Sequence, residues 1–257
     1  MRSSIIASVL VRFLSSALSR PQQQQQPQQN LFFFFFFFFF FFFFFFFFFF
    51  LSFPPPPQLN RTHDAHMFYM YFESRAGAPA SANDPVVLWM TGGPGCSSEL
   101  AVFFENGPFR IEDDLTLSDN PFGWDVGHNI LFIDQPVGTG FSFTSDPSDD
   151  VTSEKQVADD VLDFLLEFYD SKPELLKNDL FITGESYAGH YVPAVASRIV
   201  EHNGNAGRKT AELSLKGVAI GNGLTDPAVQ YGAYADYAAS KGLIGATTRK
   251  AIRSVSE

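Results

Sequence analysis

The sequence predicts an α/β fold in which a mostly parallel central sheet is flanked by helices. Short apolar runs bounded by glycine, proline or aspartate recur along residues 58–257, and such runs are typical of strands buried on both faces. Segments with helical spacing of apolar residues separate these runs, an alternation that favours a parallel sheet. Glycine-rich turns follow several of the runs, at the sheet edge where α/β proteins bind ligands.

Five strands are expected from these runs. The first is rich in aromatic residues, and the other four are nearly continuous apolar stretches, so we expect those four to be buried. In chain order, the expected ranges are His66–Arg75, Asp84–Met90, Asn129–Asp134, Asp179–Gly184 and Gly217–Asn222.

Three helices are expected between and after these strands. Ser153 followed three residues later by Gln156 forms a capping box, which predicts that the first helix begins there and ends before a proline. The second is expected over 188–202, with Gly204 as its stop signal. The third is expected over 230–240.

The chain divides by composition into residues 1–57 and residues 58–257. The first part contains 19 consecutive phenylalanines, Phe32–Phe50, between tracts of glutamine and proline. Its start resembles a secretory signal, although Arg12 interrupts the apolar stretch. We interpret this part as low-complexity sequence, either a degraded signal or a wrongly set N-terminus, and exclude it from the fold. A membrane partner is not expected unless the phenylalanine run is a real anchor.

The second part of the chain is strongly acidic. The whole chain has a formal charge of −11, but Arg2, Arg12 and Arg20 precede residue 51 and all 28 acidic residues follow it. Residues 51–257 therefore carry 14 basic against 28 acidic side chains, a formal charge of −14. Such a surface repels phosphate backbones, so nucleic acid is not an expected partner.

The stretch GESYAGHY, at 184–191, predicts a nucleophilic serine. Because it follows an apolar run and opens a helical pattern, we expect Ser186 on a strained strand-to-helix turn that exposes its hydroxyl. Gly184 and the pair Ala188–Gly189 are small enough for strand and helix to pass closely. The backbone N–H of Tyr187, at the start of that helix, is then expected to donate to an oxyanion.

A second oxyanion donor is expected from the loop WMTGGPGCSS at 89–98. This loop directly follows a buried run, and Gly92 and Gly93 offer backbone N–H groups that no side chain screens. The alternative is a tight turn without a ligand. The combination of three glycines and a proline after a buried strand favours the functional interpretation.

Several long stretches together resemble the serine carboxypeptidase family of α/β-hydrolases. They are VVLWMTGGPGCSSELAVFFENGPFRI, NPFGWDVGHNILFIDQPVGTGFS, FLLEFYDSKPELLKNDLFITGESYAGHYVPAVASRIV and LKGVAIGNGLTDP. The glycine loop looks most like the plant carboxypeptidase III-like branch. The resemblance implies an α/β-hydrolase fold, truncated before its later strands, with Ser186 as the acyl-forming nucleophile. It also implies an oxyanion hole formed by the N–H groups of Gly93 and Tyr187.

The resemblance further implies a site for the free C-terminal carboxylate of a peptide, formed by Trp89, Gly92, Glu105 and Glu185. Thr91 is a departure, because many family members have asparagine there. A threonine hydroxyl can still donate one hydrogen bond to the carboxylate, without the geometry of an amide. If both glutamates bind a carboxylate, at least one of them must be protonated.

The resemblance implies that the other two members of the triad follow the nucleophile in the order Ser, Asp, His. The histidines that follow Ser186 are His190 and His202. Neither fits as the base, because His190 lies on the helix that begins at the turn and His202 lies about 24 Å along it. Asp226 and Asp236 are the corresponding aspartates, and neither lies where the family places its acid. We expect the triad Asp and His to be absent from these 257 residues.

The leading prediction is a serine-type carboxypeptidase that acts on peptides with a free C-terminus. The alternatives are an acyltransferase of the same family, whose members tend to have Asp where this chain has Glu185, and an inactive truncated product. No cofactor and no metal are expected, and the oligomeric state is left open. The resemblance implies that Cys96 pairs with a cysteine beyond these residues, and with the sequon at Asn60 this favours the secretory pathway, vacuole or extracellular space.

Overall fold

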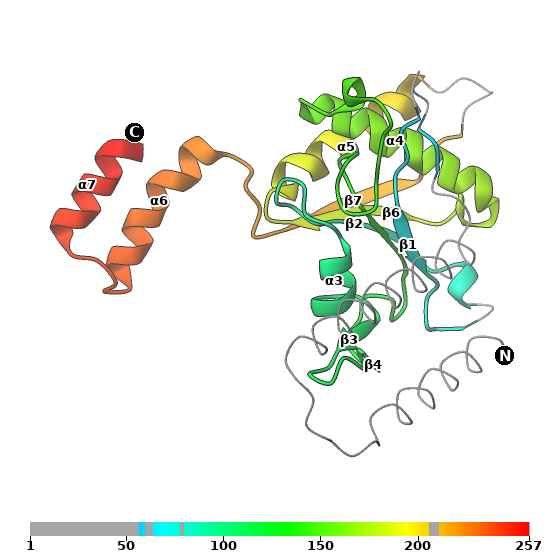
Figure 1. Cartoon of the computed structure of the whole chain (residues 1–257), viewed down its shortest axis with the longest axis horizontal. Coiled ribbons are helices and arrows are strands. Elements are labelled where there is room, and N and C mark those ends of the chain that lie inside the picture. Colours follow the sequence, from blue (N-terminus) through cyan, green and yellow to red (C-terminus); the bar gives the residue numbers. More distant parts are fainter. Residues whose placement is uncertain (1–56, 60–63, 78–79, 206–210, 257) are drawn as a thin grey trace, which may run out of the picture. The chain divides into compact units, whose positions relative to one another are not determined.

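A five-stranded sheet forms the centre of the computed structural model, which describes residues 57–59, 64–77, 80–205 and 211–256 (Figure 1). The strand order is β1-β5-β2-β6-β7; β5, β2, β6 and β7 are mutually parallel and β1 is antiparallel to β5. The strands are β1 (Tyr69–Phe72), β2 (Val86–Met90), β5 (Asn129–Ile133), β6 (Leu180–Glu185) and β7 (Leu215–Gly221). The predicted α/β class with a mostly parallel sheet is therefore confirmed.

The remaining elements are helices and one small hairpin. The hairpin pairs β3 (Phe109–Ile111) with β4 (Leu117–Asp119) in antiparallel fashion. The α-helices are α3 (Glu99–Phe104), α4 (Glu154–Ser171), α5 (Ala188–Asn205), α6 (Pro227–Ser240) and α7 (Ala246–Ser256). Short 3₁₀ turns are η1 (Ala80–Ala82), η2 (Pro147–Asp149) and η3 (Pro173–Leu175).

The two central strands, β2 and β5, are buried on both faces. Side chains alternate along a strand, so each strand contributes to two separate cores. Leu88 and Leu131 belong to the core under α4 and α5, whereas Val87 and Ile130 belong to the core under α3. Figure 1 shows α4 and α5 side by side on one face of the sheet, with α3 on the other. This double burial explains why the two segments have no polar alternation.

The predicted start of α4 is confirmed. The Ser153 hydroxyl accepts a hydrogen bond from the backbone N–H of Gln156 at 3.3 Å, which caps the helix. The reciprocal bond differs from a standard capping box, because Gln156 Oε1 accepts from the N–H of Thr152 at 2.9 Å. These two hydrogen bonds therefore hold Thr152, the residue before the N-cap, as well as the first turn of α4.

Two predicted strands differ from the structure. The first is confined to Tyr69–Phe72, since the residues at its ends bond to loops instead of to β5. The last, β7, is largely exposed, with Val218 at 51% and Ile220 at 37%, although its apolar run predicted burial. Within the described residues β7 pairs with β6 alone, so it is an outer strand, and its apolar side chains lack a covering layer there.

Two predicted helices also differ in their bounds. Gly204 does not stop α5, which extends to Asn205, because a glycine in the last turn is tolerated there without a left-handed conformation. The third helix begins at Pro227 instead of residue 230, since Asp226 accepts from the N–H of Val229 and acts as its N-cap. The sequence did not predict α3, the hairpin or α7.

The interpretations of the N-terminal segment and of the sequon at Asn60 lie outside the described residues. Among the described helices, none combines the length and the hydropathy that crossing a bilayer requires.

Candidate active site

Ser186 occupies the turn between β6 and α5 with a left-handed backbone conformation, φ = 58°. An L-residue other than glycine rarely adopts this conformation unless its surroundings impose it. Here the Ser186 N–H donates to the carbonyl of Gly221 at 2.9 Å, and the Ser186 carbonyl accepts from Gly189 at 3.0 Å and Leu224 at 2.9 Å. Backbone contacts from three segments hold the turn, and Ser186 is exposed.

Two glycines allow the strand and the helix to meet at this turn. A Cβ on Gly184 would lie 2.7 Å from the Cβ of Ala188, and a Cβ on Gly189 would lie 2.6 Å from the carbonyl oxygen of Leu224. Real Cβ atoms do not approach other heavy atoms so closely, so larger residues would push the turn apart. The steric role that the sequence predicts for these small residues agrees with the geometry.

The glycine loop after β2 lies directly against the serine turn. A Cβ on Gly92 would lie 2.7 Å from the carbonyl oxygen of Glu185 and 3.0 Å from the Cβ of Ser186. Gly93 has φ = 113°, which favours glycine, and it is exposed beside the turn. The structure therefore brings together the two segments that were expected to supply oxyanion donors.

Trp89 and Thr91 form a polar contact at the end of β2. The indole Nε1 of Trp89 donates to the hydroxyl oxygen of Thr91 at 3.1 Å, and both side chains are buried. Because this bond uses the hydroxyl as an acceptor, the hydroxyl hydrogen can still be donated to a ligand. The ring of Trp89 also contacts the ring of Trp124, edge to face, with 5.2 Å between the two ring centroids.

Glu105 lies beside Glu185, although 80 residues separate them in sequence. Burial raises the pKa of Glu105, and the charge and hydrogen bonding of Glu185 raise it further. Two neighbouring carboxyls repel each other when both are ionised, so the Glu185 carboxyl beside it favours the protonated form of Glu105. A protonated glutamic acid can donate a hydrogen bond to a ligand carboxylate, which only accepts.

Asp134, directly after β5, holds the glycine loop from behind. Its buried carboxylate accepts from the backbone N–H of Ser98 at 2.8 Å and of Phe141 at 2.9 Å. The Ser98 hydroxyl in turn accepts from the N–H of Thr91 at 3.2 Å. Asp134 thus connects the ends of two neighbouring strands.

Glu99 and Asp134 form a second pair of neighbouring carboxyls. Burial, followed by the charge of Asp134, raises the pKa of Glu99 to about 8. Burial also raises the pKa of Asp134, against the lowering effect of its two backbone donors. One proton is therefore retained by this pair in the folded state at pH values where an unfolded chain has released it.

We expect the free energy of unfolding to fall as the pH rises from about 4.5 toward 8. Glu99 has a folded pKa above its ordinary value of 4.5, so the folded state binds more protons than the unfolded state in that window, and raising the pH disfavours folding. The Glu99→Gln variant should show a flatter decline. Urea unfolding at pH 5 and pH 8 measures this, with Glu167→Gln on the exposed face of α4 as the control. An unchanged decline in Glu99→Gln would contradict the assignment.

The two histidines that follow Ser186 in sequence each contact another residue. The ring of His190 packs against the ring of Tyr187 at a centroid distance of 5.0 Å, on the first turn of α5. His202, in the last turn of α5, donates from Nε2 to the carbonyl of Ala211 at 2.9 Å. Neither histidine is joined to the serine turn by a side-chain hydrogen bond among the described residues.

The aspartates that follow Ser186 have structural partners. Asp226 caps α6, and Asp236 forms ion pairs with Arg249 at 2.7 Å and Arg253 at 3.1 Å. Cys96, in the glycine loop, is a half-buried free thiol. In the described part of the chain no cluster of three His, Cys, Asp or Glu side chains could hold a metal ion.

Residues that sequence reasoning missed lie behind the predicted site. Asp134 was expected only as the end of a strand, and Trp124 and Asn120 were part of a matching stretch without an assigned role. Trp124 contacts Trp89, and the Asn120 side chain donates to the backbone that follows Glu105. The signals that could have indicated them are a polar residue directly before a proline, Asn120, and an acidic residue directly after a buried apolar run, Asp134.

A mostly parallel sheet, helices on both faces and a serine on a strained strand-to-helix turn define an α/β-hydrolase. Residues 58–257 match the model of the family described as serine carboxypeptidase. The chain belongs to the serine carboxypeptidase family.

Named relatives agree with this membership. The chain is 58% identical over 187 residues to serine carboxypeptidase 3 of Hordeum vulgare, covering 73% of this chain and 36% of that protein. It is 57% identical over 180 residues to serine carboxypeptidase-like 48 of Arabidopsis thaliana, covering 70% of this chain and 34% of that protein. These two relatives confirm the predicted likeness to plant members, and the chain spans about a third of their length.

A solved structure supports the fold. It is the crystal structure of Kex1Δp, described as a prohormone-processing carboxypeptidase from Saccharomyces cerevisiae, with a TM-score of 0.64 and 34% identity. The match covers 72% of this chain and 40% of that one.

Proposed function

We propose that this chain forms the nucleophile and substrate-carboxylate side of a serine-type carboxypeptidase that acts on peptides with a free C-terminus. The observation that supports this most directly is the contact among three segments around Ser186. Gly92 lies against the serine turn, and Glu185, next to the serine, lies beside Glu105. A nucleophilic serine and two neighbouring carboxyls, one of them with a raised pKa, are therefore within one site.

In the proposed reaction the Ser186 hydroxyl oxygen adds to the carbonyl carbon of the last peptide bond. The N–H groups of Gly93 and Tyr187 stabilise the negative charge on the carbonyl oxygen. The C–N bond then breaks, and the released amino group takes up the proton that the Ser186 hydroxyl gives up. Water then adds to the remaining ester, its hydroxyl goes to the shortened peptide, and its other hydrogen restores the Ser186 hydroxyl. The free carboxylate of the departing residue is held by Glu105 and Glu185.

Trp89, Thr91 and Gly92 complete this carboxylate site. The Thr91 hydroxyl hydrogen and the Gly92 N–H are the donors, and Trp89 fixes the orientation of the hydroxyl through its indole N–H. We further propose the secretory pathway, the vacuole or the extracellular space as the location. The family membership supports this, as does the disulfide that the resemblance implies between Cys96 and a cysteine beyond these residues. No cofactor takes part in this reaction.

The Ser186→Ala variant should lose covalent labelling by a fluorophosphonate, because the reagent needs a nucleophilic serine beside oxyanion donors. We expect the unaltered chain to be labelled at Ser186, slowly, since no described histidine bonds to that hydroxyl. Mass spectrometry of the labelled peptide measures this. Ser240→Ala, an exposed serine in α6, is the control and should be labelled as the unaltered chain is.

The same samples distinguish the alternative functions. Incubation with an N-blocked dipeptide tests peptidase activity, and incubation with a glucose ester and an alcohol tests acyl transfer. Absence of labelling at Ser186 in the unaltered chain would overturn the proposed nucleophile and favour the inactive product. Transfer from the ester without peptide hydrolysis would favour the acyltransferase.

A further inference from the structure

Three consecutive carbonyl groups, those of Glu105, Asn106 and Gly107, receive donors from one neighbouring loop. The side-chain amide of Asn120 donates to the carbonyl of Gly107 at 2.9 Å and, at 3.4 Å, to that of Glu105. The backbone N–H of Trp124 donates to the carbonyl between them at 2.8 Å. Asn120 is only 1% exposed and its bond to the Gly107 carbonyl is buried, whereas its longer bond to the Glu105 carbonyl is half-buried.

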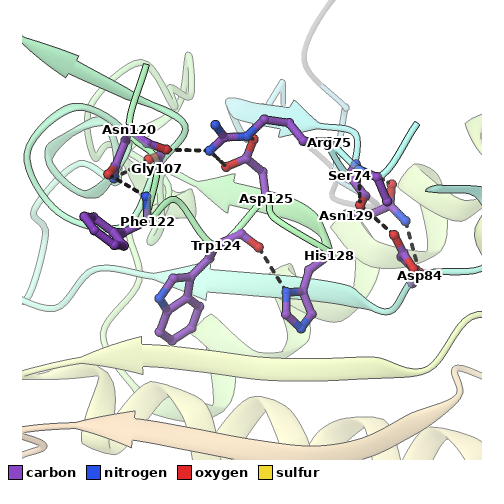
Figure 2. Close-up of polar contacts among 11 residues, drawn as sticks. Ser74, Arg75, Asp84, Gly107, Asn120, Phe122, Trp124, Asp125, His128 and Asn129 are labelled. Atoms are coloured by element: carbon purple, nitrogen blue, oxygen red, sulfur yellow. Dashed lines mark hydrogen bonds and ion pairs between the residues drawn. The ribbon is translucent and has the colours of Figure 1, made fainter. Parts of the chain in front are cut away.

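Arg75, just after β1, closes this loop. Its guanidinium donates to the backbone carbonyl of Asn120 at 2.7 Å and forms a two-pronged ion pair with Asp125, as Figure 2 shows. Gly123 permits the close packing, because a Cβ there would lie 2.7 Å from the Arg75 guanidinium and 2.8 Å from the carbonyl oxygen of Gly107. The two ends of the segment 120–125 are thus fixed to a single side chain.

The loop contacts the carboxylate site at two places. Its bonds hold the backbone of Glu105, whose side chain lies beside Glu185. The ring of Trp124, extending from the same loop, meets the ring of Trp89 at 86°. Both contacts arise from one brace, which we define as Arg75, Asn120 and Asp125.

We propose that this brace is the positioning element of the carboxylate site: it sets Glu105 opposite Glu185 and Trp124 against Trp89. The proposal rests on the proposed function only for the identity of the ligand. Two independent geometric facts support the positioning itself: the three bonded carbonyls and the indole contact. The brace residues are not catalytic, because none of them lies at Ser186.

The chain contains two tryptophans, and both belong to this site. Indoles in edge-to-face contact give an exciton couplet in circular dichroism, so the couplet reports the Trp89–Trp124 contact directly. Carboxyl NMR of the full chain, with Glu105→Gln for assignment, reports whether the pKa of Glu105 is still raised. Tryptophan fluorescence reports binding of an N-blocked dipeptide.

We expect Asn120→Ala to weaken the couplet and to return the pKa of Glu105 toward its ordinary value. The preference for a dipeptide with a free carboxylate over its C-terminal amide should fall about tenfold, the scale of one charge-assisted hydrogen bond. Asn178→Ala is the matched control, because the Asn178 amide also donates to two carbonyls, those of Ala82 at 3.0 Å and Asp84 at 2.8 Å. It should leave all three readouts unchanged.

Equal effects of Asn120→Ala and Asn178→Ala on the couplet and on Glu105 would overturn the brace as a positioning element. If Asn120→Ala does not fold, Arg75→Lys takes its place. Lysine keeps the positive charge near Asp125 but cannot form the two-pronged ion pair. The same readouts must then change in the same direction. Equal binding of the free-carboxylate and amide dipeptides by the unaltered chain would instead reject the proposed ligand. The exciton couplet and the titration of Glu105 would still test whether the brace positions the site.

Discussion

The Gly92→Ala variant should lose covalent labelling of Ser186 by about 100-fold or more, the scale of removing one oxyanion donor. The new methyl group would lie 2.7 Å from the carbonyl oxygen of Glu185 and 3.0 Å from the Cβ of Ser186, so the loop and the turn must separate. That separation moves the N–H of Gly93 away from the position of a developing oxyanion. We also expect a loss of about 1–3 kcal/mol in the free energy of unfolding, the usual cost of overpacking.

The labelling rate under a fluorophosphonate measures the first effect, and urea unfolding followed by tryptophan fluorescence measures the second. Gly232→Ala is the matched control. Gly232 lies within α6, and apart from the neighbouring backbone of that helix nothing lies within 4 Å of an added Cβ, so alanine should preserve labelling and stabilise the helix slightly. Undiminished labelling in Gly92→Ala would show that the glycine loop does not form part of the nucleophile site.

The Asp134→Ala variant should have the largest effect on stability. It leaves the buried N–H of Ser98 and the half-buried N–H of Phe141 without their acceptor. An orphaned buried donor costs about 1–3 kcal/mol, and the Phe141 N–H adds a smaller loss because water can reach it. Because Ser98 also receives the N–H of Thr91, the glycine loop should lose its support and labelling of Ser186 should slow.

The shift in the urea midpoint measures this prediction. Asp134→Asn should lie between the unaltered chain and the alanine variant, since the amide retains one acceptor oxygen for two donors. Asp236→Ala, which removes an exposed partner of Arg249 and Arg253, should leave the midpoint nearly unchanged. Comparable midpoints for Asp134→Ala and Asp236→Ala would mean that the loop does not depend on Asp134.

The sequence predicts the central elements well because burial on both faces leaves short, unbroken apolar runs bounded by turn residues. β2 and β5 are wholly buried, and their unbroken apolar runs indicate it. The start of α4 is equally predictable from the sequence, because Ser153 and Gln156 are three residues apart and their hydrogen bond is local. Ser186 also has a local signature, because the steric demand of its turn falls on glycines within three residues of it.

The parts that could not be predicted depend on contacts between distant segments. β7 contains an apolar run, as β6 does, but its exposure depends on its outer position in the sheet, which the pattern of a single strand does not contain. The proximity of Glu105 to Glu185 came from family resemblance and not from spacing. The bonds from Asn120 to the backbone around Glu105 span 13 to 15 residues and have no local sequence signal.

The alternation of β2 between two cores has a consequence for how this chain tolerates changes in length. Leu88 and Met90 face α4 and α5, whereas Val87 and Trp89 face α3. Inserting or deleting a single residue before Trp89 within the strand would exchange the two faces and carry the indole into the opposite core. Inserting or deleting two residues would leave each side chain of β2 on its present face of the sheet and would alter only where the strand ends. Whether the number of residues inserted into or deleted from this five-residue strand is odd or even therefore determines on which side of the sheet a site can form.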